Sequence, residues 1–271
     1  MFSKISEQAH RLVSLTSKIH KKSKTKVVAI TSGKGGVGKS TITANISYLI
    51  AQKGYRVAVL DADIGLANMQ VLFNLKPSAT FFDYIEGKVQ LQDILLQTQY
   101  DNITLCAGRS GYEYTKDTNT LVVSRIVNEI VELNRYDILL IDTGAGLNEY
   151  VQEFLDIADE ILAITTTDPS AITDVYALIK MLSKTKKKLL ICFNHTKKFA
   201  IGEAITNSIK ELALKNKLNK NFMVKYIGSI SSTQNIQTTS RLRKLFSKEF
   251  RYDDTTLDIE KIANKLLKEL N

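Results

Sequence analysis

Several residue types are scarce in this 271-residue sequence, which has no tryptophan, two prolines, two cysteines and three histidines. Cys106 and Cys192 each lie in an apolar, strand-like run, which argues against a disulfide framework and favours reduced core thiols. No metal-ligand spacing exists around them or around His10, His20 and His195. No apolar stretch approaches the ~20 residues that a membrane-spanning helix requires. We therefore expect a cytoplasmic protein, with any contact to the inner face of the cell membrane being peripheral.

Positive charge is in excess, since 37 lysines and arginines outnumber 28 acidic residues and give a net charge of +9. This balance favours acidic partners such as nucleotide, nucleic acid or anionic lipid, but it does not choose among them. The hydrophobic fraction of 44% supplies enough apolar material for one large α/β domain.

Residues 26–41, KVVAITSGKGGVGKST, have the pattern of a buried strand that runs into a glycine-rich loop and a helix. The apolar run from Val27 to Ile30 is typical of a strand covered on both faces. Apolar residues after the loop have the spacing of an amphipathic helix: Ile42, Ile46, Leu49 and Ile50. Between strand and helix, residues 33–40 fit the phosphate-loop pattern G-x-x-x-x-G-K-[ST].

The chemistry of a phosphate site explains these residue types. Several backbone N–H groups must point at the anion, and only glycine lets the chain come that close. Lys39 would reach the β- and γ-phosphates, and the Ser40 hydroxyl could bind Mg²⁺. The alternative is an ordinary glycine-rich turn in an α/β sheet. The expected nucleotide-binding residues of the loop are Gly33, Lys34, Gly35, Gly36, Val37, Gly38, Lys39, Ser40 and Thr41.

A second lysine, Lys34, stands near the start of the loop, giving K-G-G-V-G-K-S-T. This form resembles the deviant Walker A motif of the ParA/MinD ATPases. In that family the first lysine reaches the nucleotide of the partner subunit, so the resemblance implies ATP, Mg²⁺ and an ATP-dependent homodimer. It also gives Lys34 and Lys39 a part in catalysis. Alternatively, Lys34 is a solvated loop residue.

Two further strand ends carry acidic residues. The predicted strand over residues 56–60 ends in DADIGLAN, which is similar to the D-x-D-x-G-L-x-N signature of the MinD branch. By that resemblance Asp63 orients the attacking water and Asp61 supports the Mg²⁺ shell; a polar strand end or a helix cap is the alternative. The apolar strand that ends at Asp142 has the form of a Walker B motif, and Asp142 would hold Mg²⁺ through water.

Residues 165–180, TTTDPSAITDVYALIK, closely resemble the T-T-P-E-P-T-[SA]-I-T-D-A-Y-A-L-I-K run of FlhG/FleN/YlxH proteins. The resemblance implies control of flagellar number and placement, with an FlhF-type GTPase and flagellar switch proteins as partners. Within this run, Asp168 is expected to cap a helix whose first position is Pro169.

Residues 1–25 precede the first strand and are expected to form a partner-docking or activator segment. Their piece EQAHRL resembles the D-Q-A-x-x-L-R activator motif of FlhG-type proteins, with Glu7 in place of Asp and Val13 in place of Arg. The docking residues would be Glu7, Gln8, Ala9 and Leu12. A frayed leader with a solvated charge run is the alternative.

Asn194 closes the predicted strand over residues 189–193 and matches the family position whose amide contacts adenine. The alternative is a strand-end asparagine that satisfies a turn. After a last strand over residues 222–230, the sequence SSTQ departs from the I-P-x-D-like base-binding loop of relatives. Residues 255–270 predict an amphipathic helix that either packs on its own domain or attaches to membrane as in MinD-type ATPases.

Strands alternate with helices from residue 26 onward, which predicts an α/β fold with a mostly parallel sheet flanked by helices. Residues 76–100 are expected to form two short helices. The resemblance covers residues 26–271 and implies a three-layer P-loop NTPase domain that acts as a slow, partner-regulated ATPase. Three alternatives remain: a MinD-like division-site regulator, a non-catalytic docking or transcription regulator, and a DNA segregation ATPase. The last would bind DNA through exposed basic residues such as Arg241, Arg243, Lys244 and Lys248.

Overall fold

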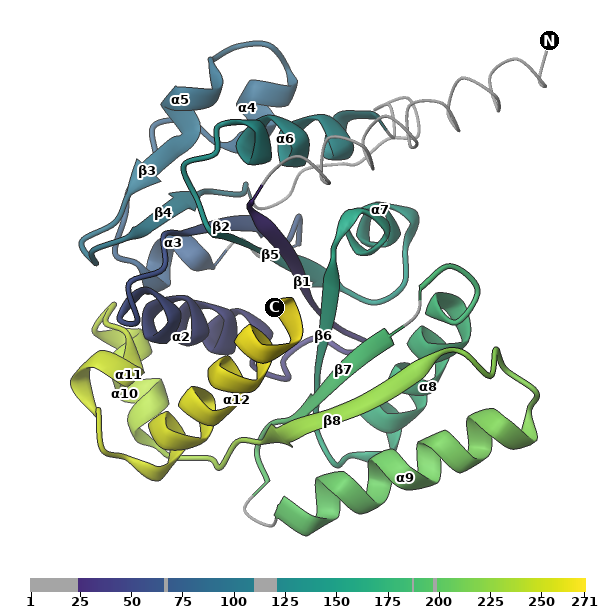
Figure 1. Ribbon diagram of the computed structural model, residues 1–271. Helices are drawn as coiled ribbons and strands as arrows, with labels where there is room; N and C mark the ends of the chain where they lie inside the picture. The colour runs from purple at the N-terminus through teal and green to yellow at the C-terminus, as the bar shows by residue number, and fades with distance from the viewer. Residues whose placement is uncertain (1–23, 66–67, 110–120, 187, 197–198) are drawn as a thin grey trace, which may run out of the picture.

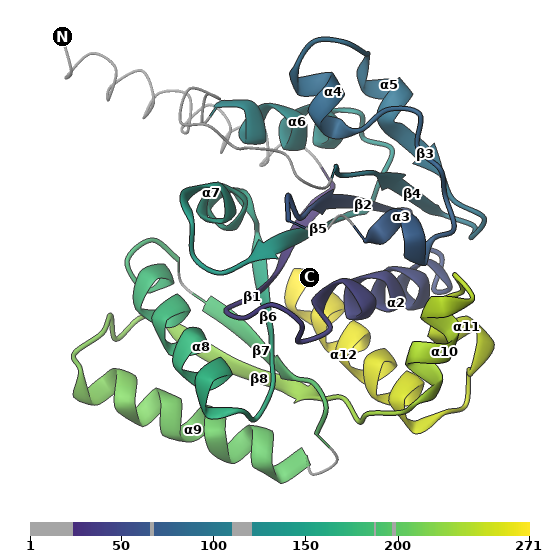
Figure 2. The same cartoon turned by 180° about the vertical axis from the view of Figure 1, so that it is seen from behind.

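The computed structural model describes residues 24–65, 68–109, 121–186, 188–196 and 199–271. The predicted docking residues of the N-terminal segment lie outside the described part of the chain: Glu7, Gln8, Ala9 and Leu12. The described residues form a sheet with helices on both of its faces (Figures 1 and 2).

Within the described residues the sheet has eight strands in the order β3-β4-β2-β5-β1-β6-β7-β8. Neighbouring strands pair in parallel, except that β3 and β4 are antiparallel. The strands are β1 (Lys26–Ser32), β2 (Val57–Ala62), β3 (Leu95–Gln97), β4 (Ile103–Cys106), β5 (Ile138–Ala145), β6 (Glu160–Thr165), β7 (Lys188–Phe193) and β8 (Met223–Ser229).

The helices connect these strands across the two faces. They are α2 (Lys39–Ala51), α3 (Met69–Leu72), α4 (Phe81–Ile85), α5 (Leu91–Ile94), α6 (Leu121–Glu132), α7 (Glu149–Ile157), α8 (Pro169–Leu182), α9 (Phe199–Lys215), α10 (Asn235–Arg241), α11 (Phe246–Glu249) and α12 (Asp254–Leu270). This arrangement confirms the predicted α/β fold with a mostly parallel sheet and flanking helices.

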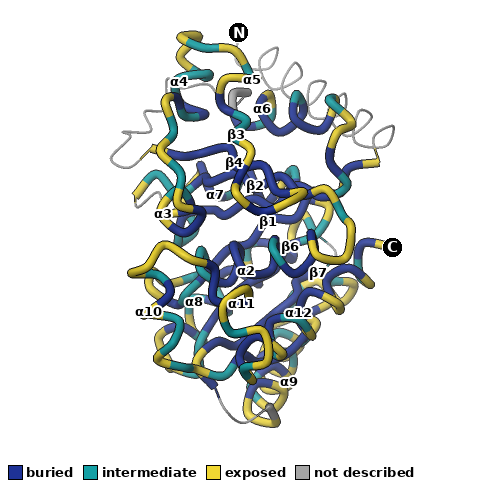
Figure 3. The backbone as a smooth tube through the Cα atoms, turned by 90° about the vertical axis from the view of Figure 1, so that its left-hand side faces the viewer, coloured by how far each residue is buried: buried dark blue, intermediate teal, exposed yellow. Residues whose placement is uncertain are grey.

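Alternating side chains of β1 point to the two faces of the sheet and enter two separate cores. Val27 and Ala29 pack in the core with α6, α7 and α8, whereas Val28 and Ile30 pack in the core with α2 and α12. All four side chains are fully buried, as expected for a strand covered on both faces. Figure 3 shows the central strands as buried and the outer loops as largely exposed.

The parallel pairing brings the carboxyl ends of the central strands to one edge of the sheet. In the register of the sheet, Asp142 of β5 lies beside Ile30 of β1 on one side and Asp61 of β2 on the other. Ligands of open α/β sheets bind at this edge, and the phosphate-loop sequence leaves β1 here.

Two parts of the fold differ from the sequence-based expectation. Residues 76–100 were expected to form two short helices, but Leu95 and Leu96 in this range belong to β3 and are only partly buried. β3 has three residues, and its hydrogen bonds come from the antiparallel partner β4, with Leu95 opposite Cys106. A strand this short depends on its tertiary partner, so its own residue pattern does not predict it. The polar helix α10 was also not anticipated.

The C-terminal helix α12 packs against α2 and β8. Its buried stripe is Ile259, Ile262, Ala263, Leu266, Leu267 and Leu270. Leu257, an apolar residue near the start of the same helix, is 39% exposed. Among the described residues, no helix combines the length and apolarity needed to cross a bilayer. Because its apolar stripe is buried against α2 and β8, the apolar face of α12 is part of the domain core.

We expect Leu266→Ala to lower the free energy of unfolding by about 2–5 kcal/mol, because the fully buried side chain leaves a cavity when truncated. Leu257→Ala on the same helix is the matched control and should cost less than about 1 kcal/mol, since Leu257 is partly in solvent. Urea titration followed by circular dichroism measures both. Equal effects of the two substitutions would contradict the packing of α12 into the core.

Candidate functional site

The predicted phosphate loop connects β1 to α2, as the sequence pattern indicates. Gly38 is the residue directly before α2 and has φ 88°, and Gly36 has φ 78°. Residues other than glycine rarely adopt this left-handed backbone conformation. A Cβ atom added at Gly35 or Gly36 would meet no atom within 4 Å. The chain therefore leaves open space beside the middle of the loop.

Gly33, at the start of the loop, lies against helix α8. A Cβ atom at Gly33 would be only 2.3 Å from the Cβ atom of Asp174. The next residue, Lys34, is exposed, and its Nζ donates a hydrogen bond to the Ser170 hydroxyl at 3.0 Å. The loop is thus in contact with the first turns of α8, and sequence reasoning identified neither Asp174 nor Ser170 as part of this contact.

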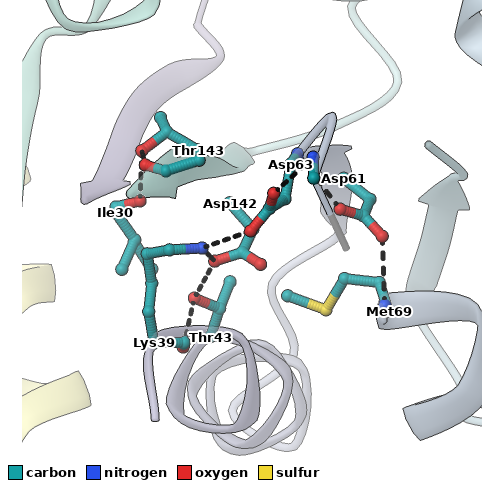
Figure 4. A network of polar contacts seen from close by, with 10 residues as sticks. Ile30, Lys39, Thr43, Asp61, Asp63, Met69, Asp142 and Thr143 are labelled. Atoms are coloured by element: carbon teal, nitrogen blue, oxygen red, sulfur yellow. Dashed lines mark hydrogen bonds and ion pairs between the residues drawn. The ribbon is translucent and has the colours of Figure 1, made fainter. Parts of the chain in front are cut away.

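Lys39 is the first residue of α2, and its side chain is 6% exposed. Its Nζ atom lies 2.9 Å from Oδ1 of Asp142 and 3.8 Å from Oδ2 of Asp63 (Figure 4). Thr43, one turn further along α2, donates its hydroxyl to the same Asp142 oxygen at 3.2 Å. The structure therefore joins three predicted site residues, Lys39, Asp63 and Asp142, which come from separate motifs.

Thr43 was not among the predicted site residues. Thr43 follows Lys39 by four residues, which places both side chains on the same face of α2. The helical spacing could therefore have predicted that Thr43 lies beside Lys39 in the site. Ser40 is half-buried in the first turn of the same helix.

Asp61 is fully buried beside Asp142 but is directed away from Lys39 (Figure 4). Its carboxylate accepts hydrogen bonds from the backbone N–H groups of Met69 at 3.0 Å and Asp63 at 3.3 Å. Burial, and then the charge of Asp142, raise the pKa of Asp61 to about 8, which favours its protonated form near neutral pH. Asp61 thereby holds together the two ends of the segment between β2 and α3.

Gly108 packs directly on Asp61 and was missed by sequence reasoning. A Cβ atom at Gly108 would lie 2.4 Å from the carbonyl oxygen of Asp61. The chain after β4 therefore approaches the site so closely that a side chain at this position would displace the backbone of β2.

The second carboxylate oxygen of Asp142, Oδ2, is buried and has no hydrogen-bond partner among the described residues. An unpaired buried polar atom is costly, so this oxygen fits a ligand that supplies a partner, such as a magnesium ion with its bound waters. Carboxylate and hydroxyl oxygens are suitable donors for Mg²⁺.

No group of three or more His, Cys, Asp or Glu side chains in the described residues is arranged to hold a metal ion by itself. Mg²⁺ is commonly held by one or two protein oxygens together with phosphate oxygens and water. The donor set around Asp142 and Ser40 fits this mode of binding.

Asp168 and Pro169 occupy the predicted positions at the start of α8, as N-cap and first helical residue. The Asp168 side chain, however, makes no capping hydrogen bond to the helix. It instead accepts the hydroxyl hydrogen bond of Thr166 at 3.2 Å. The predicted position of Asp168 is confirmed, but the predicted capping contact was wrong.

Asn194 is buried at the end of β7, and its Nδ2 donates to the Val37 carbonyl of the loop at 2.8 Å. A cavity of about 380 Å³ adjoins this contact. It is lined by residues that include Thr41, Asn194, His195, Ile230, Gln237 and Arg241. Gln237 and Arg241 lie on α10 and were not predicted as lining this cavity, because α10 itself was not anticipated.

Comparison with known proteins gives a consistent result. A family model for ParA, described as NUBPL iron-transfer P-loop NTPase, matches residues 23–267. The flagellum site-determining protein YlxH of Helicobacter pylori is 37% identical over 92% of this chain and 84% of its own length. The antiactivator FleN of Pseudomonas aeruginosa is 30% identical over 89% of this chain and 85% of its own length.

Solved structures agree in fold. The cell division ATPase MinD of Pyrococcus furiosus has a TM-score of 0.77 at 22% identity and covers 90% of this chain and 99% of its own. A chain of the MinC:MinD cell division protein complex of Aquifex aeolicus has a TM-score of 0.74 at 25% identity, and the match covers 90% of this chain and 96% of that one. With the family model and two relatives spanning most of the sequence, the chain belongs to the ParA/MinD family of P-loop ATPases and is related to the FlhG/FleN flagellar regulators.

Proposed function

We propose that this protein is an ATP-hydrolysing switch that controls flagellar number and placement. The observation that carries the proposal is the buried Lys39 ammonium group, which contacts both Asp142 and Asp63. Lys39 directly follows the glycine-rich loop. The similarity to YlxH and FleN over most of the chain supports the flagellar role. MinD of Pyrococcus horikoshii, which shares the fold, was solved with Mg-ADP.

Each site residue has a role in this proposal. Backbone N–H groups of residues 33–41 bind the phosphates, and Lys39 places its charge on the β- and γ-phosphates. Ser40 and Asp142 hold Mg²⁺, which when bound neutralises charge on the phosphate oxygens. Asp63 orients the attacking water, and Asp61 supports this group by fixing the Asp63 backbone.

Lys34 has its role in the ATP-bound homodimer. In the single chain its ammonium group is on the surface, at the hydroxyl of Ser170, and a long exposed lysine costs little to move. We propose that it leaves this contact on dimerisation and reaches the nucleotide of the partner subunit. An FlhF-type GTPase and flagellar switch proteins are the proposed partners of the dimer.

Lys39→Ala should weaken ATP binding by roughly 100-fold or more, because it removes a buried cation that pairs with phosphate. Isothermal titration calorimetry with Mg-ATP measures the change. Lys53→Ala is the control, since Lys53 makes only a partly exposed ion pair with Glu260. Because the substitution also leaves Asp142 without its cation, circular dichroism should first establish that the variant folds. Unchanged ATP affinity in a folded variant would refute the site assignment.

Asp63→Ala should bind ATP but hydrolyse it at least about 100-fold more slowly, since the residue that positions the water is lost. Light scattering on a sizing column should then find a stable dimer in Mg-ATP. The exposed acid Asp168 provides the control variant Asp168→Ala, which should hydrolyse ATP at the normal rate. A monomeric Asp63→Ala protein in saturating ATP would contradict the proposed dimer, and a normal hydrolysis rate would favour a non-catalytic role.

The flagellar role is tested by affinity capture with ATP-loaded Asp63→Ala protein, with and without residues 1–25. We expect an FlhF-type GTPase or a switch protein to be captured, and to be lost without the leader. Capture of centromere-binding proteins, together with salt-sensitive DNA binding, would instead identify a segregation ATPase. Recruitment to anionic vesicles through α12 would favour a MinD-like regulator.

A further inference from the structure

The two oxygens of the Asp142 carboxylate have different surroundings (Figure 4). Oδ1 lies 2.9 Å from Nζ of Lys39 and 3.2 Å from the hydroxyl oxygen of Thr43, and both of these residues belong to α2. Oδ2 is buried and has no hydrogen-bond partner among the described residues. The contacts with α2 therefore use one oxygen of Asp142 and leave the other oxygen for a further partner.

The Thr43 side chain is fully buried and is held in one orientation by its own helix. Its hydroxyl oxygen lies 2.9 Å from the carbonyl oxygen of Lys39, one turn earlier in α2, a contact that selects one of the two χ1 rotamers that threonine adopts in helices. The hydroxyl has a single hydrogen, and both of its neighbours are acceptors. A hydrogen bond to an ionised carboxylate is roughly twice as strong as one to a neutral carbonyl, so Asp142 is the stronger acceptor for this hydrogen.

The two donors at Oδ1 differ in their freedom to leave Asp142. In the proposed function the Lys39 ammonium group serves the β- and γ-phosphates, and its flexible four-carbon side chain allows it to turn towards them. The Thr43 hydroxyl is attached directly to a β-branched carbon with restricted rotation, and it cannot follow. When Lys39 moves to the phosphates, Thr43 is the donor from α2 that stays at Oδ1.

We infer that Thr43 is a positioning residue for Asp142: its hydroxyl holds Oδ1 and thereby presents Oδ2 to the water shell of Mg²⁺. The inference rests on the proposed nucleotide site, in which Asp142 holds the metal. Thr43 acts through Asp142 alone. Without the hydroxyl, the carboxylate is free to rotate about its terminal bond, whose torsion is broad. The loss therefore falls on binding that depends on the metal.

The test compares nucleotide binding with and without the metal. Calorimetry measures ATP affinity in Mg²⁺ and in excess EDTA for the unmodified chain, for Thr43→Val and for Thr43→Ser. Valine keeps the branched shape and lacks the hydroxyl, whereas serine keeps the hydroxyl and lacks the methyl group.

Thr206→Val is the matched control. Thr206 is also fully buried in a helix, and its hydroxyl likewise donates to the carbonyl oxygen four residues earlier, that of Gly202, at 2.8 Å. Thr206 lies on α9, far from α2 in the sheet order, and donates to no carboxylate among the described residues. It therefore reproduces the loss of the bond within the helix without the loss of a contact to Asp142.

We expect Thr43→Val to reduce the gain in ATP affinity that Mg²⁺ confers by about tenfold, because a hydrogen bond to a charged group is lost. Affinity in EDTA should stay unchanged, Thr43→Ser should restore the effect of Mg²⁺, and Thr206→Val should behave as the unmodified chain. An equal loss of affinity with and without Mg²⁺ in Thr43→Val would overturn the inference, since the residue would then act through the loop or the helix. No loss in either condition would also overturn it.

The unmodified chain separates this inference from the proposed function. If it binds no ATP in either condition, or if Mg²⁺ does not affect its affinity, the proposed site is wrong and the inference falls with it. If only the Thr43 variants depart from expectation, the site stands and the inference alone is wrong. Thermal unfolding without nucleotide establishes that Thr43→Val folds. Should it not fold, Thr43→Ala and Thr206→Ala replace the two valine variants, and the same comparison decides.

Discussion

The site depends on one buried charge interaction, between the ammonium group of Lys39 and the carboxylates of Asp142 and Asp63. A buried cation or anion alone would be strongly unfavourable, so each partner requires the others. Asp142 within β5 and Asp63 directly after β2 supply the negative groups that pair with the Lys39 ammonium group. The carboxylates therefore hold the Lys39 side chain in place at the start of α2.

The parallel sheet makes this interaction possible. β2 and β5 pair in parallel, so residues 61 and 142, which are distant in sequence, become neighbours in register. Burial of Asp61, and then the negative charge of the neighbouring Asp142, raise the pKa of Asp61 to about 8. One acid is then used as a structural acceptor of backbone hydrogen bonds, while the other keeps the contact with Lys39.

The sequence predicted the elements that have strong local patterns. The apolar run before the loop, the apolar stripe of α2 and the apolar run before Asp142 led to the correct fold. The structure also brings together Lys39, Asp63 and Asp142, which the sequence motifs had singled out separately. Features that depend on distant contacts were not predictable in this way. The three-residue strand β3 requires its partner β4, α10 has little apolar residue pattern, and the direction of the Asn194 amide depends on a carbonyl 157 positions away.

The contact between Gly33 and Asp174 has a mechanical consequence. Because a Cβ atom at residue 33 would be 2.3 Å from the Cβ atom of Asp174, the loop backbone rests directly on α8 without an intervening side chain. Close-packed protein interiors have low compressibility. The loop cannot shift towards α8 without moving that helix. Any rearrangement of the loop in that direction would therefore be transmitted to the outer surface of the molecule as a displacement of α8, the helix that carries the FlhG-like sequence.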